Sequence, residues 1–177
     1  MHRRLILTVI ALLSAAPAFA LDMPARKPGL WELKMSLEGR DMSSFAMKHC
    51  VDAATDKLMN ANFGGPANQA CAKQEVTKAA GTIIVDSVCK FGDATTTSHA
   101  VVNGNFESAY TVNVTSTREG GSPLPGQAPG APTHMTIQAT WLGPCTQGQR
   151  AGDIVMSNGM KMNVLDMPKM GGGLKQP

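Results

Sequence analysis

Hydrophobic and polar side chains alternate one by one along several stretches of this chain, and this alternation constrains the fold more than any other feature. The clearest stretch is residues 31–38, where every odd position is apolar and every even position is polar. Successive side chains of a β-strand point to opposite faces, so the pattern predicts a strand with one buried and one solvated face. Residues 106–117 and 134–141 repeat it.

The remaining strands are predicted from runs of Thr, Val and Ile between turn residues. Gly81, in the loop 79–81, can adopt a positive φ and predicts one hairpin, and Asn103-Gly104 predicts a second with a type I′ turn. A short further hairpin is predicted over 152–164, turning at 157–159. The predicted long strands number about seven, with hairpin connections as the commonest link: 31–38, 44–50, 71–78, 82–90, 95–102, 106–117 and 134–141.

Strands in this order and with such short connections predict a mainly β fold, an antiparallel meander. A long meander hides its edges by curling, so we expect a barrel or half-barrel rather than a flat sheet. One short helix is predicted after the second strand. Asp52 is its N-cap, Ala54, Leu58 and Ala61 share its apolar face, and residues 62–66 end it.

The first twenty residues have the organisation of a secretion signal. His2-Arg3-Arg4 is basic, residues 5–16 are apolar, and Ala18-Phe19-Ala20 is a small-residue cleavage site. We therefore expect a signal peptide at 1–20, a single domain at 21–169 with a mobile loop at 119–132, and a disordered tail at 170–177. The expected location is the periplasm, and no later stretch predicts a membrane span.

The charge of the exported chain argues against some partners. Of 16 lysines and arginines, Arg3 and Arg4 leave with the signal, so 14 remain against 13 acidic residues. No basic cluster remains, so neither nucleic acid nor an anionic membrane surface is an expected partner.

Four cysteines in an exported chain predict two disulfides, and the sequence alone allows three pairings. Cys71 and Cys89 lie symmetrically about Ala80, in the middle of the predicted hairpin loop, and would face each other across two strands. This layout favours Cys71 with Cys89, which leaves Cys50 with Cys145.

Several of these segments together resemble a known family. They are Lys27-Pro28-Gly29-Leu30-Trp31-Glu32, Cys50-Val51-Asp52, the spaced Cys71 and Cys89, and Trp141-Leu142-Gly143-Pro144-Cys145 leading to Gly152-Asp153. The chain is similar to the bacterial exported proteins grouped as the domain of unknown function 3617. The resemblance implies an envelope location, and it supplies no catalytic residues.

No catalytic or cofactor motif is present in the sequence. It has no G-x-S-x-G, H-E-x-x-H, P-loop or dinucleotide-binding turn, and paired cysteines exclude a thiol nucleophile. We expect a protein that is not an enzyme and holds no cofactor. His49, His99 and His134 could meet inside a small barrel and bind zinc or copper, but histidines at the surface, or with only some of their hydrogen bonds made, are the more ordinary interpretation.

The two tryptophans raise the main functional question. Each falls on the apolar side of an alternating strand, and in a curled sheet the first and last strands can be neighbours. They could simply fill the core. Alternatively, they could line a pocket for a lipid or another hydrophobic small molecule. The candidate residues are Trp31, Leu33, Met35, Tyr110, Val112, Ile137 and Trp141.

A second hypothesis rests on the methionines near the C-terminus, whose thioethers are ligands for Cu(I). The alternative is that methionine fills an irregular apolar segment. A third hypothesis is a domain that binds an envelope protein through residues 119–132 and an exposed sheet edge. The leading expectation is a non-catalytic binding or accessory protein of the cell envelope. The candidate copper ligands are Met156, Met160, Met162, Met167 and Met170.

Overall fold

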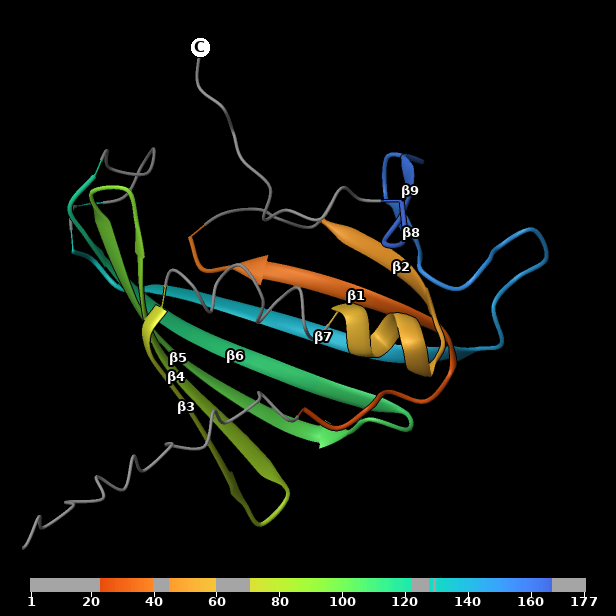
Figure 1. The fold of residues 1–177 in the computed structure, drawn as a ribbon, viewed down its shortest axis with the longest axis horizontal. Coiled ribbons are helices and arrows are strands. Elements are labelled where there is room, and N and C mark those ends of the chain that lie inside the picture. Colours follow the sequence, from red (N-terminus) through yellow and green to blue (C-terminus); the bar gives the residue numbers. More distant parts are fainter. Residues whose placement is uncertain (1–22, 40–44, 60–70, 122–127, 129, 167–177) are drawn as a thin grey trace, which may run out of the picture.

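In the part of the chain that the structure describes, nine antiparallel strands form one curled sheet, and a helix packs on one of its faces (Figure 1). The computed structural model describes residues 23–39, 45–59, 71–121, 128 and 130–166. The order across the sheet is β3-β4-β5-β6-β7-β1-β2-β8-β9. The strands are β1 (Gly29–Leu37), β2 (Ala46–Val51), β3 (Cys71–Ala79), β4 (Thr82–Phe91), β5 (Ala94–Asn105), β6 (Ala109–Glu119), β7 (Thr133–Gly143), β8 (Asp153–Met156) and β9 (Lys161–Asn163).

The predicted mainly β fold, with one helix after the second strand and two disulfides, is confirmed. Of the two forms expected, the sheet takes the open one, because among the described residues β3 and β9 are its two edges. β1 pairs with β7, so the first strand and the last long strand are neighbours, and Trp31 lies directly opposite Trp141.

The strand register sorts side chains onto two very different faces. Odd-numbered residues of β1 share one face with Ile137 of β7 and Val112 of β6, and we call this the inner face. Its side chains align in four rows that cross the strands. The first row is Trp141, Trp31, His49, Ile154 and Met162; the second is Gly104, Tyr110, Ala139, Leu33, Met47 and Met156; the third is Ile83, Val102, Val112, Ile137, Met35 and Phe45; the fourth is Val85, Ala100, Val114, Met135 and Leu37.

The helix at residues 53–59 begins with a reciprocal cap. The Thr55 N–H donates to Asp52 Oδ1 at 2.8 Å, and the Asp52 N–H donates to Thr55 Oγ1 at 3.0 Å. The predicted N-cap is thus confirmed, but the predicted apolar face is only partly right, since of its described members Leu58 alone packs against the core. Ala54 is exposed, whereas Thr55, Asp56 and Met59 are buried. Ala61 lies outside the described residues.

The turn predicted at Asn103-Gly104 is also wrong, because β5 continues to Asn105 and the chain turns at residues 106–108. Asn105 supplies the turn chemistry, since its Oδ1 accepts a hydrogen bond from the Glu107 N–H at 2.7 Å. Gly104, with φ +122°, instead gives room to β6, because a Cβ there would lie 2.7 Å from Tyr110 Cα.

Both favoured disulfides are present. Cys71 bonds to Cys89 across the β3–β4 hairpin, and Cys50 at the end of β2 bonds to Cys145 after β7. The second bond links two strands that flank β1, so it fixes the helix end of the inner face.

Several predicted features fall on residues that the structure does not describe: the signal at 1–20, part of the loop at 119–132, and the tail at 170–177. The predicted C-terminal hairpin is present as β8 and β9. Within the described ranges, no helix has the length and apolar character needed to cross a membrane.

We expect the two disulfides to differ in their contribution to stability. Cys50–Cys145 spans 95 residues of sequence and Cys71–Cys89 spans 18, so chain entropy predicts losses of about 4–5 and about 3 kcal/mol on removal. The paired variants Cys50→Ala/Cys145→Ala and Cys71→Ala/Cys89→Ala, compared by urea unfolding, test this. An equal or reversed order would contradict it.

Candidate functional site

Trp31 fills the core at the helix end of the inner face. Its side chain is 0 % exposed, its Nε1–H donates to the Lys27 carbonyl at 2.8 Å, and its ring lies 5.6 Å from that of Tyr110. Buried apolar residues from three strands, the helix and the C-terminal segment surround it. They are Val51, Met59, Ala139, Ile154 and Val164. Trp31 is therefore a core residue.

Trp141, opposite Trp31, has a different environment. It is half-buried, its Nε1–H donates to the Pro28 carbonyl at 3.2 Å, and the Lys27 ammonium lies 3.9 Å from its ring centroid. A Cβ on Gly29 would lie 2.6 Å from Trp141 Nε1. The glycine of the Gly29-Leu30-Trp31 motif thus makes room for the indole of the other tryptophan.

The candidate pocket residues divide into two groups on the inner face. Trp31, Leu33, Tyr110 and Trp141 belong to or pack against the core beneath the helix. Met35, Val112 and Ile137 lie further along the same strands, in the third row, and are only half-buried. The structure therefore places the whole set on one face but gives its members different surroundings.

On the inner face, burial is greatest around Trp31 and is lower over most of the third and fourth rows, although Ile83 and Val102 in the third row are buried. In the first row Trp31 and His49 are buried, at 0 % and 2 % exposed. In the fourth row every residue is half-buried, and in the third row the members from β6, β7 and β1 are half-buried too. We call the third and fourth rows the open rows. From β4 to Phe45 all of their side chains are apolar, and on β3 the third row continues to Lys78 and the fourth to Val76.

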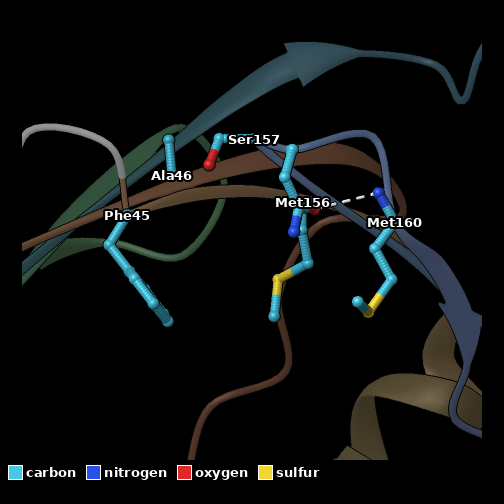
Figure 2. Close-up of a pocket in the computed structure, with 6 residues that line it drawn as sticks. Phe45, Ala46, Met156, Ser157 and Met160 are labelled. Atoms are coloured by element: carbon cyan, nitrogen blue, oxygen red, sulfur yellow. Dashed lines mark hydrogen bonds between the residues drawn. The ribbon is translucent and has the colours of Figure 1, made fainter.

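A groove of about 290 Å³ lies at one margin of the inner face, between the start of β2 and the β8–β9 turn (Figure 2). Its large apolar lining residues are Phe45, Met156 and Met160, and Ala46, Ser157 and Asn158 complete the lining. The Phe45 carbonyl accepts a hydrogen bond from the Met35 N–H at 3.1 Å, so the groove adjoins the third row. Figure 2 shows the Phe45 and Met156 side chains projecting from the same side of the strands.

A buried ion pair lies at the closed end of the inner face. Arg26 donates to Asp56 twice, from Nε to Oδ1 at 2.6 Å and from its backbone N–H to Oδ2 at 2.9 Å. The side chains are 6 % and 0 % exposed. Removing one partner of such a pair costs about 3–5 kcal/mol, so it ties the N-terminal segment to the helix.

Next to this pair lies a histidine with no hydrogen-bond partner among the described residues. His49 is 2 % exposed, and neither Nδ1 nor Nε2 is bonded. Burial, assisted by the nearby Arg26 cation, lowers the pKa of His49 from 6.5 to about 4, so the imidazole is neutral at physiological pH. Burial also raises the pKa of Tyr110, in the second row.

The structure does not bring the three histidines together. His99 and His134 lie on the outer face, where His99 Nδ1 is 2.7 Å from Asp86 Oδ1 and His134 Nδ1 is 3.1 Å from the Thr115 hydroxyl. Both are about half exposed. Within the described ranges, no three His, Cys, Asp or Glu side chains converge as metal ligands.

The candidate copper methionines are also separated. Met156 and Met162 are on the inner face and pack against the core, whereas Met160 is 55 % exposed in the β8–β9 turn. Met167 and Met170 lie outside the described residues.

One buried acid near this hairpin has a structural role. Asp153 accepts hydrogen bonds from Asn163 Nδ2 at 2.9 Å and from the Arg150 N–H at 2.9 Å, and Lys161 Nζ lies 2.8 Å away. Burial alone would raise the pKa of Asp153, but these partners together lower it to about 2. The carboxylate therefore holds β9 against β8.

Sequence reasoning missed Arg26, Asp56 and the isolation of His49. The spacing of Thr55, Asp56 and Met59 places them on one side of the helix and could have indicated the buried side. Asp56 argued against burial of that side, because a carboxylate is almost never buried without a partner. The partner, Arg26, is 30 residues away and lies outside any regular element.

A comparison with known families gives one match. The family model described as a protein of unknown function, DUF3617, matches residues 26–145, which is more than half of the chain. The chain belongs to the DUF3617 family. The matched region begins at Arg26 and ends at Cys145, so it contains the buried ion pair, both disulfides and the open rows. No curated protein and no solved structure matches the chain.

The lowered pKa of His49 predicts that the stability of the protein depends on pH. Between pH 6.5 and about 4 the unfolded chain binds a proton that folded His49 does not, so the free energy of unfolding falls as the pH falls, by roughly 3 kcal/mol in all. His49→Leu should remove this slope, and His99→Gln should retain it. Urea unfolding in EDTA at pH 7, 6, 5 and 4 measures it; equal slopes in wild type and His49→Leu would contradict the account.

Proposed function

We propose that this DUF3617 protein is an exported, non-catalytic binding protein that holds an elongated hydrophobic molecule on the open rows of its inner face. The observation that carries the proposal is the incomplete burial of these rows. Eleven apolar side chains, ten from five strands and Phe45 just before β2, lie next to one another on one face of a curled sheet, and most are half-buried. Ligand sites are typically concave and mainly apolar.

The dimensions of the surface suit a long, narrow ligand. The third row runs from Ile83 on β4 to Phe45 before β2 and crosses five inter-strand steps. At about 4.8 Å each, these steps span about 24 Å. The groove at Phe45, Met156 and Met160 extends the row at one end. A fully extended acyl chain is a ligand of this shape.

The polar groups near the surface favour a neutral ligand. Arg26, the cation buried at the closed end, is neutralised by Asp56. Lys27 lies over the Trp141 ring. Between β4 and Phe45 the open rows carry no charged side chain, and Lys78, which continues the third row on β3, is exposed. An anionic head group would therefore not find a buried counter-charge there.

Export supports an envelope role. The first twenty residues have the three parts of a secretion signal. The two disulfides are consistent with an oxidising, extracytoplasmic compartment. Two observations support the non-catalytic part of the proposal. Every cysteine is disulfide-bonded, so none can act as a nucleophile. The histidine–acid contacts described above lie on the solvated outer face rather than in a pocket.

A charge placed on the open rows tests the proposal. Ile137→Lys puts an ammonium in the third row, whereas Gln138→Lys puts the same group on the outer face of the same strand. We expect Nile red, a neutral apolar probe displaced by a long-chain alcohol, to bind wild type saturably. Ile137→Lys should weaken binding at least about ten-fold, because a ligand bound there would have to strip water from the lysine ammonium. Gln138→Lys should leave binding unchanged.

Two results would contradict the proposal. One is the absence of saturable, displaceable binding to the wild-type protein. The other is an equal effect of both lysines, because the probe would then be responding to surface charge rather than occupying the inner face. Thermal unfolding of each variant shows whether it is folded at the temperature of the titration.

A further inference from the structure

We propose that His49, Met47 and Met156 form a binding site for a soft monovalent metal ion, Cu(I), at the closed end of the inner face. This site shares Met156 with the groove that extends the open rows, but it does not depend on the function proposed for them. It also differs from the ligand set that the sequence suggested, because it contains a histidine and only one of the C-terminal methionines.

The strand register brings the three side chains together. Met47 and His49 are two residues apart on β2 and therefore point to the same face. Met156 on β8 is directly opposite Met47 and diagonal to His49. Diagonal neighbours on one face of an antiparallel pair lie about 7–8 Å apart at their Cα atoms, a distance that long side chains bridge. Met47 and Met156 both pack against the buried cluster that contains Ile154, the residue opposite His49.

The state of His49 is the second, independent observation. The imidazole is 2 % exposed, and among the described residues neither ring nitrogen has a hydrogen-bond partner. A buried polar group without a partner costs about 1–3 kcal/mol. A metal ion bound to one ring nitrogen would remove part of this cost. Because burial keeps the ring neutral, a nitrogen lone pair is free to bind a metal without first losing a proton.

The donor chemistry selects the ion. Two thioethers and one imidazole are soft or intermediate ligands, which favour Cu(I) over the hard cations Mg²⁺ and Ca²⁺. Because the three ligands are neutral, they do not offset the charge of a bound ion. A monovalent ion therefore places the smallest possible charge in the core. The Arg26 cation nearby opposes it, but Asp56 at 2.6 Å offsets that field.

The groove described above supplies a route from solvent. Met156 lines it, and so does Met160, which is 55 % exposed (Figure 2). An ion captured at the exposed thioether of Met160 would pass to Met156 and from there to His49. Met160 is thus expected to influence how fast the ion binds rather than how tightly.

Competition against a chromophoric Cu(I) chelator, with ascorbate as reductant and the protein expressed from its complete sequence, tests the site. Titration with Ag(I), which resembles Cu(I) but is not redox-active under these conditions, provides a second measurement. We expect one ion per chain. Met47→Leu and Met156→Leu should each weaken binding at least about ten-fold, and His49→Gln should abolish it. Met135→Leu, the same change in the fourth row of the inner face, is the matched control and should bind as wild type does.

The leucine substitutions preserve apolar volume and are expected to fold, so the test does not depend on His49→Gln. X-ray absorption of the copper complex should show both nitrogen and sulfur neighbours. The proposal is overturned if no ion binds in competition with the chelator, if Met47→Leu and Met156→Leu bind as tightly as wild type, or if the copper spectrum lacks nitrogen.

Discussion

β1 lies between β7 and β2, and this pairing joins the two parts of the sheet. On one side β3 to β7 form a continuous meander, and on the other β2, β8 and β9 complete the sheet. The same pairing sets Trp31 opposite Trp141 and His49, in the row beneath the helix. The Cys50–Cys145 disulfide links the segments on both sides of β1, so it holds the arrangement covalently.

From this junction, burial decreases along the inner face. The helix and the Arg26–Asp56 pair close one end, where the side chains are almost inaccessible. At the other end the same strands continue with the same alternation, but most of their apolar side chains are half-buried, with Ile83 and Val102 as buried exceptions. One face therefore combines a core that stabilises the fold with a less buried apolar surface, to which we assign the proposed ligand, and both follow from a single alternating pattern.

Local sequence patterns predicted the strands well because alternation and turn residues act over a few neighbours. The β3–β4 hairpin and its disulfide followed from the symmetry of Cys71 and Cys89 about the turn. The errors arose where distant contacts decide. Asn103-Gly104 has the composition of a turn, but β5 and β6 stay paired as far as Asn105 and Ala109. Asp56 is buried because Arg26, far away in the sequence, pairs with it. The isolation of His49 depends on three strands at once, so no local pattern reveals it.

Methyl NMR can show whether a ligand occupies the open rows of the inner face. Val114 and Ile137 carry methyl groups on the inner face, and Ile84 and Val101 carry similar groups on the outer face of the same sheet. On titration with a neutral long-chain alcohol, the account predicts saturable shifts of the Val114 and Ile137 signals, while those of Ile84 and Val101 stay in place. Equal shifts on both faces, or none on the inner face, would contradict it.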